Sequence, residues 1–312
     1  FVAFLSVLTN RKFTATQYAS LFALTAIFPK LMAAKSGEWV SQMGYETFFS
    51  GKYLNQYGAP GAGGVEHVPP GWDKWVGLVG NSRYYNYTIS NDGAKEVHGD
   101  NYATDYLTDV VKNHTINFIR GQAYSGKPFF AMASVPACHS PHEPAPQDAF
   151  HFKPEKKVPR NPNYGTGWNE KHWLVENEGK IWEANPVRAQ FSDWEHNRRL
   201  EVLLSVDDMV EELVGVLDTL NVLDNTYIFY TADHGYHLGQ FGLMKDKRFP
   251  YEFDIFLGLY FFGHPIFSLN ENLTDAAIKL FKTLFESPIQ QIFNFEIFFF
   301  LISSIVNISD KI

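Results

Sequence analysis

Three apolar runs of strand length constrain the fold of this chain more than any other feature of its sequence. They span residues 46–50, 128–134 and 226–231. Each run is continuous instead of alternating, which is typical of strands buried on both faces of a parallel sheet. Apolar residues recur at helical spacing over residues 203–217, with two glutamates on the opposite face. The pattern predicts an α/β protein with a mostly parallel central sheet flanked by helices.

Each of the three runs leads into a polar cluster. The first is followed by Lys52, the second by Cys138 and His139, and the third by Asp233 and His234. In open parallel sheets, ligands bind beyond the carboxyl ends of the strands. We therefore expect these clusters to meet on one edge of the sheet.

The charge balance limits what the chain can bind. Lys and Arg number 26 against 34 Asp and Glu, a net charge of −8, which argues against a general nucleic-acid binder because phosphate neutralisation needs a basic face. An acidic ligand must be met by local positive charge. Lys52 and Lys247 are candidates, since a lysine can hold a phosphate or sulfate oxygen, although an exposed surface lysine is the simpler interpretation of either one. A basic loop offers further cations: Lys153, Lys156, Lys157 and Arg160. These cations can steer an acidic substrate toward the site, although a solvated loop is the more common outcome.

Asp233 and His234 are candidate metal ligands. At a strand end, with Gly235 permitting a tight turn, the carboxylate and the imidazole can face one ion. Aspartate suits calcium or magnesium, whereas histidine suggests zinc or another transition metal. The alternative is that Asp233 caps the next segment and His234 is an ordinary loop residue. The pair Asp207 and Asp208 lies inside the helical pattern and most simply forms a solvated face.

His139 and Cys138 are candidates for proton transfer and nucleophilic attack. The ordinary pKa of imidazole lies near neutrality, so His139 can act as a general acid, or it can be structural. Cys138 is the only cysteine, which excludes an intramolecular disulfide and thiolate zinc sites. A nucleophilic thiol needs a base or a depressed pKa, so a small buried filler is the simpler interpretation.

The two ends of the chain differ in amino-acid composition from its middle. Residues 1–38 are apolar, begin without methionine or a basic n-region, and predict a buried helix over residues 19–34. Residues 256–312 hold 11 of the 28 phenylalanines. The run 292–306 is shorter than the roughly 20 residues of a membrane span, so we expect a buried helix or sequence foreign to the fold. We interpret the chain as a fragment or an imperfect gene model with residues 39–255 as its folded domain.

Four N-x-[ST] sequons favour a secreted or lumenal protein. They lie at Asn86, Asn113, Asn272 and Asn307. Each is an acceptor motif for N-glycosylation, which occurs in the secretory pathway. The sequence therefore favours a glycoprotein.

Several long motifs resemble the glucosamine-6-sulfatases of the sulfatase family. They occupy residues 43–58, 66–72, 84–88, 171–174, 204–209 and 230–241. The family has a lysosomal branch acting on N-acetylglucosamine 6-sulfate and an extracellular branch of heparan sulfate 6-O-endosulfatases. Residues 59–67, 159–163 and 246–248 look like the lysosomal branch, whereas residues 75–79 and the Thr-Ala-Asp-His-Gly form look like the extracellular one. The resemblance favours the lysosomal branch.

This resemblance implies a fold, a reaction and roles for five residues. The fold is alkaline-phosphatase-like, and the reaction is hydrolysis of 6-O-sulfate esters on glucosamine residues of heparan or keratan sulfate, in the lysosome or after secretion. In the family, a cysteine converted to formylglycine attacks sulfur while calcium holds the sulfate oxygens. By position, Asp233 and His234 are implied as calcium ligands, Lys52 and Lys247 as sulfate-binding residues, and His139 as a sulfate ligand or the acid that protonates the leaving alcohol.

The chain also departs from the family pattern. Its sequence contains neither the Cys-x-Pro-Ser-Arg motif nor the Asp-Asp pair that precedes it, and Cys138 is followed by His-Ser-Pro. Residues 39–255 are thus expected to form a partial, incomplete sulfatase domain that does not hydrolyse sulfate esters. The alternative is a catalytically dead module that binds sulfated glycans through Lys52, Lys247 and the basic loop. A phosphatase-type relative is a third interpretation.

Overall fold

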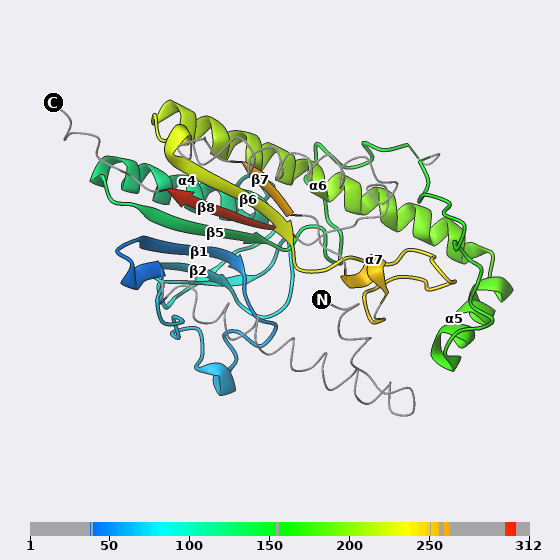
Figure 1. Ribbon diagram of the computed structural model, residues 1–312. Coiled ribbons are helices and arrows are strands. Elements are labelled where there is room, and N and C mark those ends of the chain that lie inside the picture. The colour runs from blue at the N-terminus through cyan, green and yellow to red at the C-terminus, as the bar shows by residue number, and fades with distance from the viewer. Residues whose placement is uncertain are drawn as a thin grey trace, which may run out of the picture.

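In the computed structural model, the described residues form one mixed β-sheet with helices packed along it (Figure 1). The description covers residues 38–255, apart from 39, 154–155 and 250, together with residues 259–262 and 297–303. The helix expected over residues 19–34 lies outside these ranges. From one edge to the other, the strands are β4 (Ala94–Val97), β3 (Thr88–Asn91), β2 (Lys74–Leu78), β1 (Glu46–Lys52), β5 (Phe129–Val135), β8 (Ile297–Ser303), β6 (Thr226–Ala232) and β7 (Leu259–Phe262).

The three apolar runs form β1, β5 and β6, as the sequence predicted. Strand β1 pairs in parallel with both β2 and β5. Strand β8 pairs antiparallel with both β5 and β6, so β5 and β6 run in the same direction. The carboxyl ends of β1, β5 and β6 therefore lie on one edge of the sheet, which confirms the expected α/β class. The sheet is mixed and not mostly parallel as expected, because among the described strands only the pairings of β1 are parallel.

The segment that forms β8 was expected to be a buried helix or sequence foreign to the fold. The helix expectation is wrong for Ile297–Ser303, which pairs as a strand between β5 and β6. Short apolar runs do not distinguish a helix from a strand by periodicity. The composition of this run, Ile-Phe-Phe-Phe-Leu-Ile, is the β-branched and aromatic mixture that strands favour.

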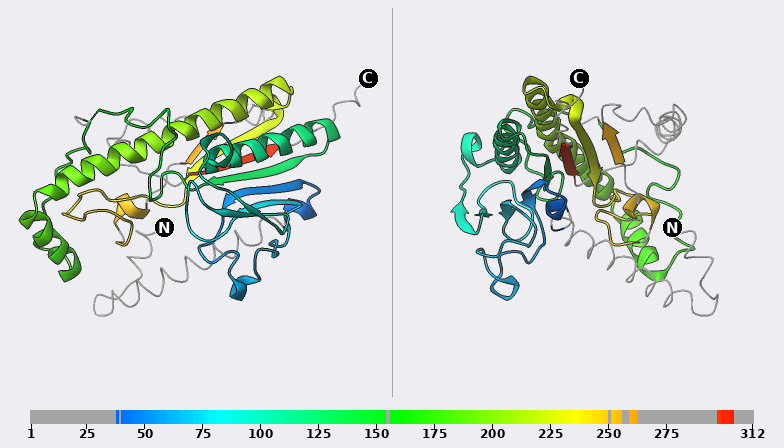
Figure 2. Two further views of the ribbon diagram at one scale, coloured as in Figure 1. Left: turned by 180° about the vertical axis from the view of Figure 1, so that it is seen from behind. Right: turned by 60° about the vertical axis from the view of Figure 1, so that its left-hand side comes forward.

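Two long helices cover one face of the sheet. The helices are α3 (Tyr102–Asp105), α4 (Leu107–Ser125), α5 (Trp173–Ala184), α6 (Val187–Thr219) and α7 (Glu252–Ile255), with 3-10 turns η1 (Pro60–Ala62) and η2 (Leu223–Asn225). Figures 1 and 2 show α4 and α6 lying side by side, with α6 extending well beyond the sheet. Within the described ranges, no helix is long and apolar enough to span a bilayer.

The apolar stripe predicted over residues 203–217 forms the carboxyl half of α6. Val206, Met209 and Leu213 are buried in the main core, whereas Glu211 is exposed. Cys138 is fully buried in the same core, as expected of a small filler. The helix therefore anchors its carboxyl half in the core, and its amino half continues toward the carboxyl edge of the sheet.

Adjacent residues of β1 face opposite sides of the sheet, as the pleat requires. Phe48 stacks on Phe118 of α4 with ring centroids 4.7 Å apart. Phe49 stacks on Trp75 at 4.5 Å on the other side, where Trp75 Nε1 donates a hydrogen bond of 2.6 Å to the Tyr57 hydroxyl. Both faces of β1 are thus buried, which explains its continuous apolar sequence.

Gly51 allows β1 to stay close to β5 at the carboxyl edge. Its φ is 109°, and a Cβ there would clash with the carbonyl oxygen of Ser134 in β5. The Ser134 hydroxyl donates a hydrogen bond of 2.7 Å to the carbonyl of Lys52. The glycine thus keeps the last two residues of β1, itself and Lys52, close to the end of β5.

We expect Gly51→Ala to destabilise the protein by about 2–4 kcal/mol, because it adds both backbone strain and a steric clash. Gly121→Ala is the matched control, since a Cβ there meets nothing within 4 Å and alanine is the better helix former. Urea unfolding measures both. Equal unfolding midpoints for the two variants would contradict the role given to Gly51.

Candidate functional site

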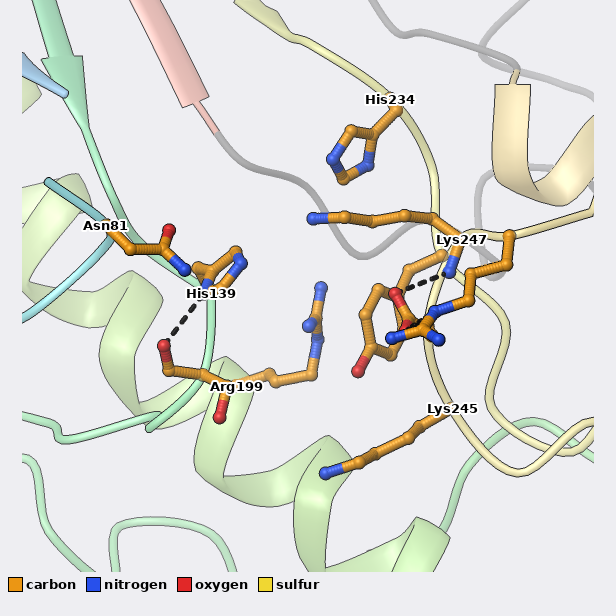
Figure 3. Close-up of a pocket in the computed structure, with 10 residues that line it drawn as sticks. Asn81, His139, Arg199, His234, Lys245 and Lys247 are labelled. Atoms are coloured by element: carbon orange, nitrogen blue, oxygen red, sulfur yellow. Dashed lines mark hydrogen bonds and ion pairs between the residues drawn. The ribbon is translucent and has the colours of Figure 1, made fainter. Parts of the chain in front are cut away.

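A pocket opens where the segments that follow β5 and β6 meet the amino half of α6. Its volume is about 270 Å³. Ligand pockets for drug-sized molecules measure about 300–1,000 Å³, so this cavity suits a ligand the size of one sugar. The pocket is lined by Asn81, His139, Ser140, Arg199, His234, Tyr236, Lys245, Asp246, Lys247 and Arg248 (Figure 3).

Two histidines from different strand ends face this pocket. His139 Nδ1 lies 2.7 Å from the carbonyl of Ser140, and His234 Nδ1 lies 2.7 Å from the carbonyl of Gly235. Because a carbonyl only accepts, Nδ1 carries the proton in each ring. Nε2 is therefore the nitrogen through which His139 can exchange a proton with a ligand, and it can donate a hydrogen bond only when the ring carries a second proton. Nε2 of His234 lies 3.3 Å from a carboxylate oxygen of Asp233.

Asp246 shapes the loop that carries Lys247. Its Oδ1 accepts a hydrogen bond of 3.0 Å from the backbone N–H of Lys247, and its Oδ2 pairs with the guanidinium of Arg248. Figure 3 shows the Lys247 side chain extending across the pocket beneath the ring of His234. Four lining residues are cationic against the single carboxylate of Asp246, so the pocket suits an anion.

Two of the five predicted site residues, Lys52 and Asp233, are not among those that line the pocket. Lys52 Nζ donates a hydrogen bond of 2.6 Å to Asn55 Oδ1, and Asp233 Oδ2 lies 3.3 Å from His234 Nε2. Lys52 is the last residue of β1, and Asp233 directly follows β6, so both residues lie at strand ends on this edge. The structure thus brings together the other three predicted residues.

The described residues do not form a calcium site by themselves. Calcium takes about 6–8 oxygen ligands, whereas Asp233 and His234 offer one carboxylate and one imidazole. Within the described part of the chain, no three His, Cys, Asp or Glu side chains are grouped to hold an ion. Cys138 does not fit a formylglycine either, because it is fully buried in the core. Asp207 and Asp208 are exposed on α6, which agrees with a solvated face.

A buried carboxylate ties the walls of the pocket together. Glu195 is fully buried on α6; its Oε1 lies 3.1 Å from His142 Nε2 and accepts a hydrogen bond of 2.8 Å from the Tyr236 hydroxyl. His142 Nδ1 donates to the carbonyl of Cys138 at 2.9 Å. The bond between Nε2 and Oε1 therefore needs a further proton, shared by the pair. Burial alone would raise the pKa of Glu195, but its bonds to His142 and Tyr236 lower it.

The sequence did not single out several of the lining residues. Lys245 and Arg248 flank Lys247, and three cations in four residues were a visible signal for a basic wall. Arg199 was missed because it precedes the helical stripe that the apolar spacing revealed. Its burial within α6 could be seen only in the structure.

An α/β fold with a cationic pocket at the carboxyl edge of its sheet defines a protein suited to an anionic ligand. A family model described as "Sulfatase" matches residues 36–265, and the chain belongs to the sulfatase family. This confirms the resemblance seen in the sequence.

Relatives support both branches of that resemblance. The chain is 51% identical over 215 residues to human N-acetylglucosamine-6-sulfatase, covering 69% of this chain and 38% of that protein. It is 42% identical over 253 residues to a putative extracellular sulfatase Sulf-1 homologue of Caenorhabditis elegans, covering 78% of this chain and 34% of that protein. The chain thus spans little more than a third of the length of these relatives.

A solved structure shows the same fold. It is of a protein in complex with its substrate D-glucosamine-2-N,6-O-disulfate, and it matches with a TM-score of 0.58 at 22% identity, covering 73% of this chain and 55% of that one. The match confirms the expected sulfatase fold.

His196, next to Glu195 on α6, makes stability depend on pH. Burial, followed by the positive charges of Lys156 and Arg199, lowers its pKa from 6.5 to about 4. The imidazole therefore binds a proton more readily in the unfolded chain than in the folded one. The contribution of neutral His196 to the free energy of unfolding is thus fully present above pH 6.5. We expect a loss of about 2–3 kcal/mol as the pH falls from 6.5 to 4.

Urea unfolding across this pH range measures the effect. His196→Gln should reduce the dependence of the free energy of unfolding on pH between 6.5 and 4, because the titrating imidazole is removed. His67→Gln, at an exposed histidine, should keep the wild-type slope. The explanation fails if both variants keep it.

Proposed function

We propose that the protein acts on 6-O-sulfate esters of glucosamine residues in glycosaminoglycans such as heparan or keratan sulfate. The observation that carries this proposal is the convergence of His139, His234 and Lys247 on one cationic pocket, in a chain 51% identical to an N-acetylglucosamine-6-sulfatase. The runner-up is a catalytically dead module that binds the same esters.

The pocket residues suit a sulfate ester. The ammonium of Lys247 supplies a compact positive charge for a sulfate oxygen, and Nε2 of His139 can bind the same group or protonate the leaving alcohol. Lys52, at the neighbouring strand end, is proposed as a second sulfate ligand. Positive charge stabilises the charge that develops on a transferring sulfuryl group.

Both candidate functions lead to the same expectation for this sequence by itself, namely that it binds these esters without hydrolysing them. Its only cysteine is buried in the core and its sequence lacks the formylglycine motif of the family. Asp233 and His234 are proposed as two ligands of a calcium ion, which when bound would supply positive charge to the sulfate oxygens. They are too few to form that site alone.

The proposed location is the lysosome or the extracellular space. Two sequons lie on the described surface: Asn86 is exposed in a loop, and Asn113 is exposed on α4. Their exposure supports a glycoprotein of the secretory pathway. The proposed partner is a sulfated glycosaminoglycan.

Calorimetric titration with N-acetylglucosamine 6-sulfate tests the proposal. The wild-type chain should bind it more tightly than N-acetylglucosamine or its 6-phosphate, and should release no inorganic sulfate. Lys247→Gln and His139→Gln should each weaken binding about tenfold or more, because each removes a charge-assisted hydrogen bond.

Lys95→Gln is the matched control, since Lys95 is exposed on β4; it should bind like the wild type. Equal binding of sulfated and unsulfated sugar would refute the function. Tighter binding of the phosphate would favour a phosphatase-type relative, and steady sulfate release would refute the absence of turnover.

A further inference from the structure

His237 and Asp254 form a buried pair that the proposed sulfate site does not use. Each residue is 2% exposed, and His237 Nδ1 lies 2.8 Å from Asp254 Oδ1 and 3.0 Å from Asp254 Oδ2. Because a carboxylate only accepts, Nδ1 carries the proton and donates the hydrogen bond. A buried charge without a partner is costly, so each member of the pair fixes the place of the other.

Asp254 also binds the loop that carries Lys247. Its Oδ2 accepts a hydrogen bond of 3.2 Å from the backbone N–H of Phe249. On the other side of Lys247, the carbonyl of Asp246 accepts a bond of 2.9 Å from the backbone N–H of His237. Lys247 thus lies between two anchors, and each anchor belongs to one member of the buried pair.

The helix that carries Asp254, α7, is tied to the end of β6. The backbone N–H of Gly235 donates a hydrogen bond of 2.8 Å to the carbonyl of Asp254. A Cβ on Gly235 would clash with the carbonyl oxygen of Phe253, so only glycine lets α7 pack this closely. His234 directly precedes Gly235, and Lys247 extends beneath its ring (Figure 3). The contacts of α7 therefore hold these two pocket residues relative to one another.

We propose that His237 and Asp254 are positioning residues that hold Lys247 at the pocket for its anionic ligand. This inference rests on the proposed function. Neither residue is among those that line the pocket, so the pair acts through the loop and not by touching the ligand. A lysine side chain loses rotamer freedom when it binds. A loop that is already fixed reduces the ordering cost of binding.

Two substitutions of His237 separate positioning from packing. His237→Asn keeps a side-chain N–H at the place of Nδ1 but leaves a cavity, whereas His237→Leu fills most of the cavity and removes the donor. In calorimetric titration with N-acetylglucosamine 6-sulfate, His237→Leu should bind about threefold to tenfold more weakly than the wild type. His237→Asn should bind like the wild type, although its cavity lowers the urea midpoint.

A double-mutant cycle identifies the residue through which the pair acts. In the Lys247→Gln background, His237→Leu should change the affinity by less than about twofold, because no ammonium remains to be positioned. His98→Leu is the matched control. His98 Nδ1 lies 3.4 Å from Asp105 Oδ1, and His98 is not among the residues that line the pocket, so this variant should bind like the wild type.

Hydrogen exchange followed by nuclear magnetic resonance tests the anchor without a ligand. The Phe249 amide should be protected in the wild type and in His237→Asn, and should exchange about tenfold faster in His237→Leu. If His237→Leu fails to fold, the exchange of the wild type and the affinity of His237→Asn still decide the matter.

Wild-type affinity in His237→Leu overturns the inference. A loss of the same size with and without Lys247→Gln also overturns it, because it would indicate general loosening of the pocket. So does fast exchange of the Phe249 amide in the wild type, or binding by His237→Asn as weak as that of Lys247→Gln. If the wild type does not prefer the 6-sulfate over the unsulfated sugar, the proposed function itself fails, which no result on a variant can show.

Discussion

The buried carboxylate of Glu195 is the contact on which the geometry of the pocket depends. Through Oε1 it holds His142, from the segment after β5, and Tyr236, from the segment after β6. Burial raises the pKa of the Tyr236 phenol, so this group remains a donor at neutral pH. Removing one partner of such a buried group leaves the other unsatisfied at a cost of about 1–3 kcal/mol. Three stretches distant in sequence are thus held in register by one side chain.

Local charge in the pocket opposes the charge of the whole chain. The sequence has a net charge of −8, yet four of the ten lining residues are lysine or arginine and only one is acidic. Acidic surface elsewhere repels polyanions, whereas a cationic cavity with low-dielectric walls concentrates the field. Arg160 of the basic loop contributes little to this contrast, because its guanidinium already binds the Asp193 carboxylate at 2.6 Å.

The sequence predicted the strands that position the site better than it predicted the side chains that line the pocket. Continuous apolar runs indicated β1, β5 and β6, and their ends correctly placed His139 and His234 at one edge. It did not predict β8, because a short apolar run fits a helix or a strand. Nor did it indicate Arg199, since a buried cation interrupts the hydrophobic pattern by which helix faces are recognised. Tertiary contacts determine that residue's environment.

The helix α6 is long enough to reach from the core of the protein to the pocket. With 33 residues and a rise of about 1.5 Å per residue, the helix is about 50 Å long. Its carboxyl half is clamped in the core, and its amino half bears Glu195 and Arg199. Loss of helical structure in the amino half would remove Glu195 and Arg199 from the pocket wall, whereas the apolar contacts of the carboxyl half would remain. A ligand that binds only when this half is helical would stabilise the helical form of the amino half.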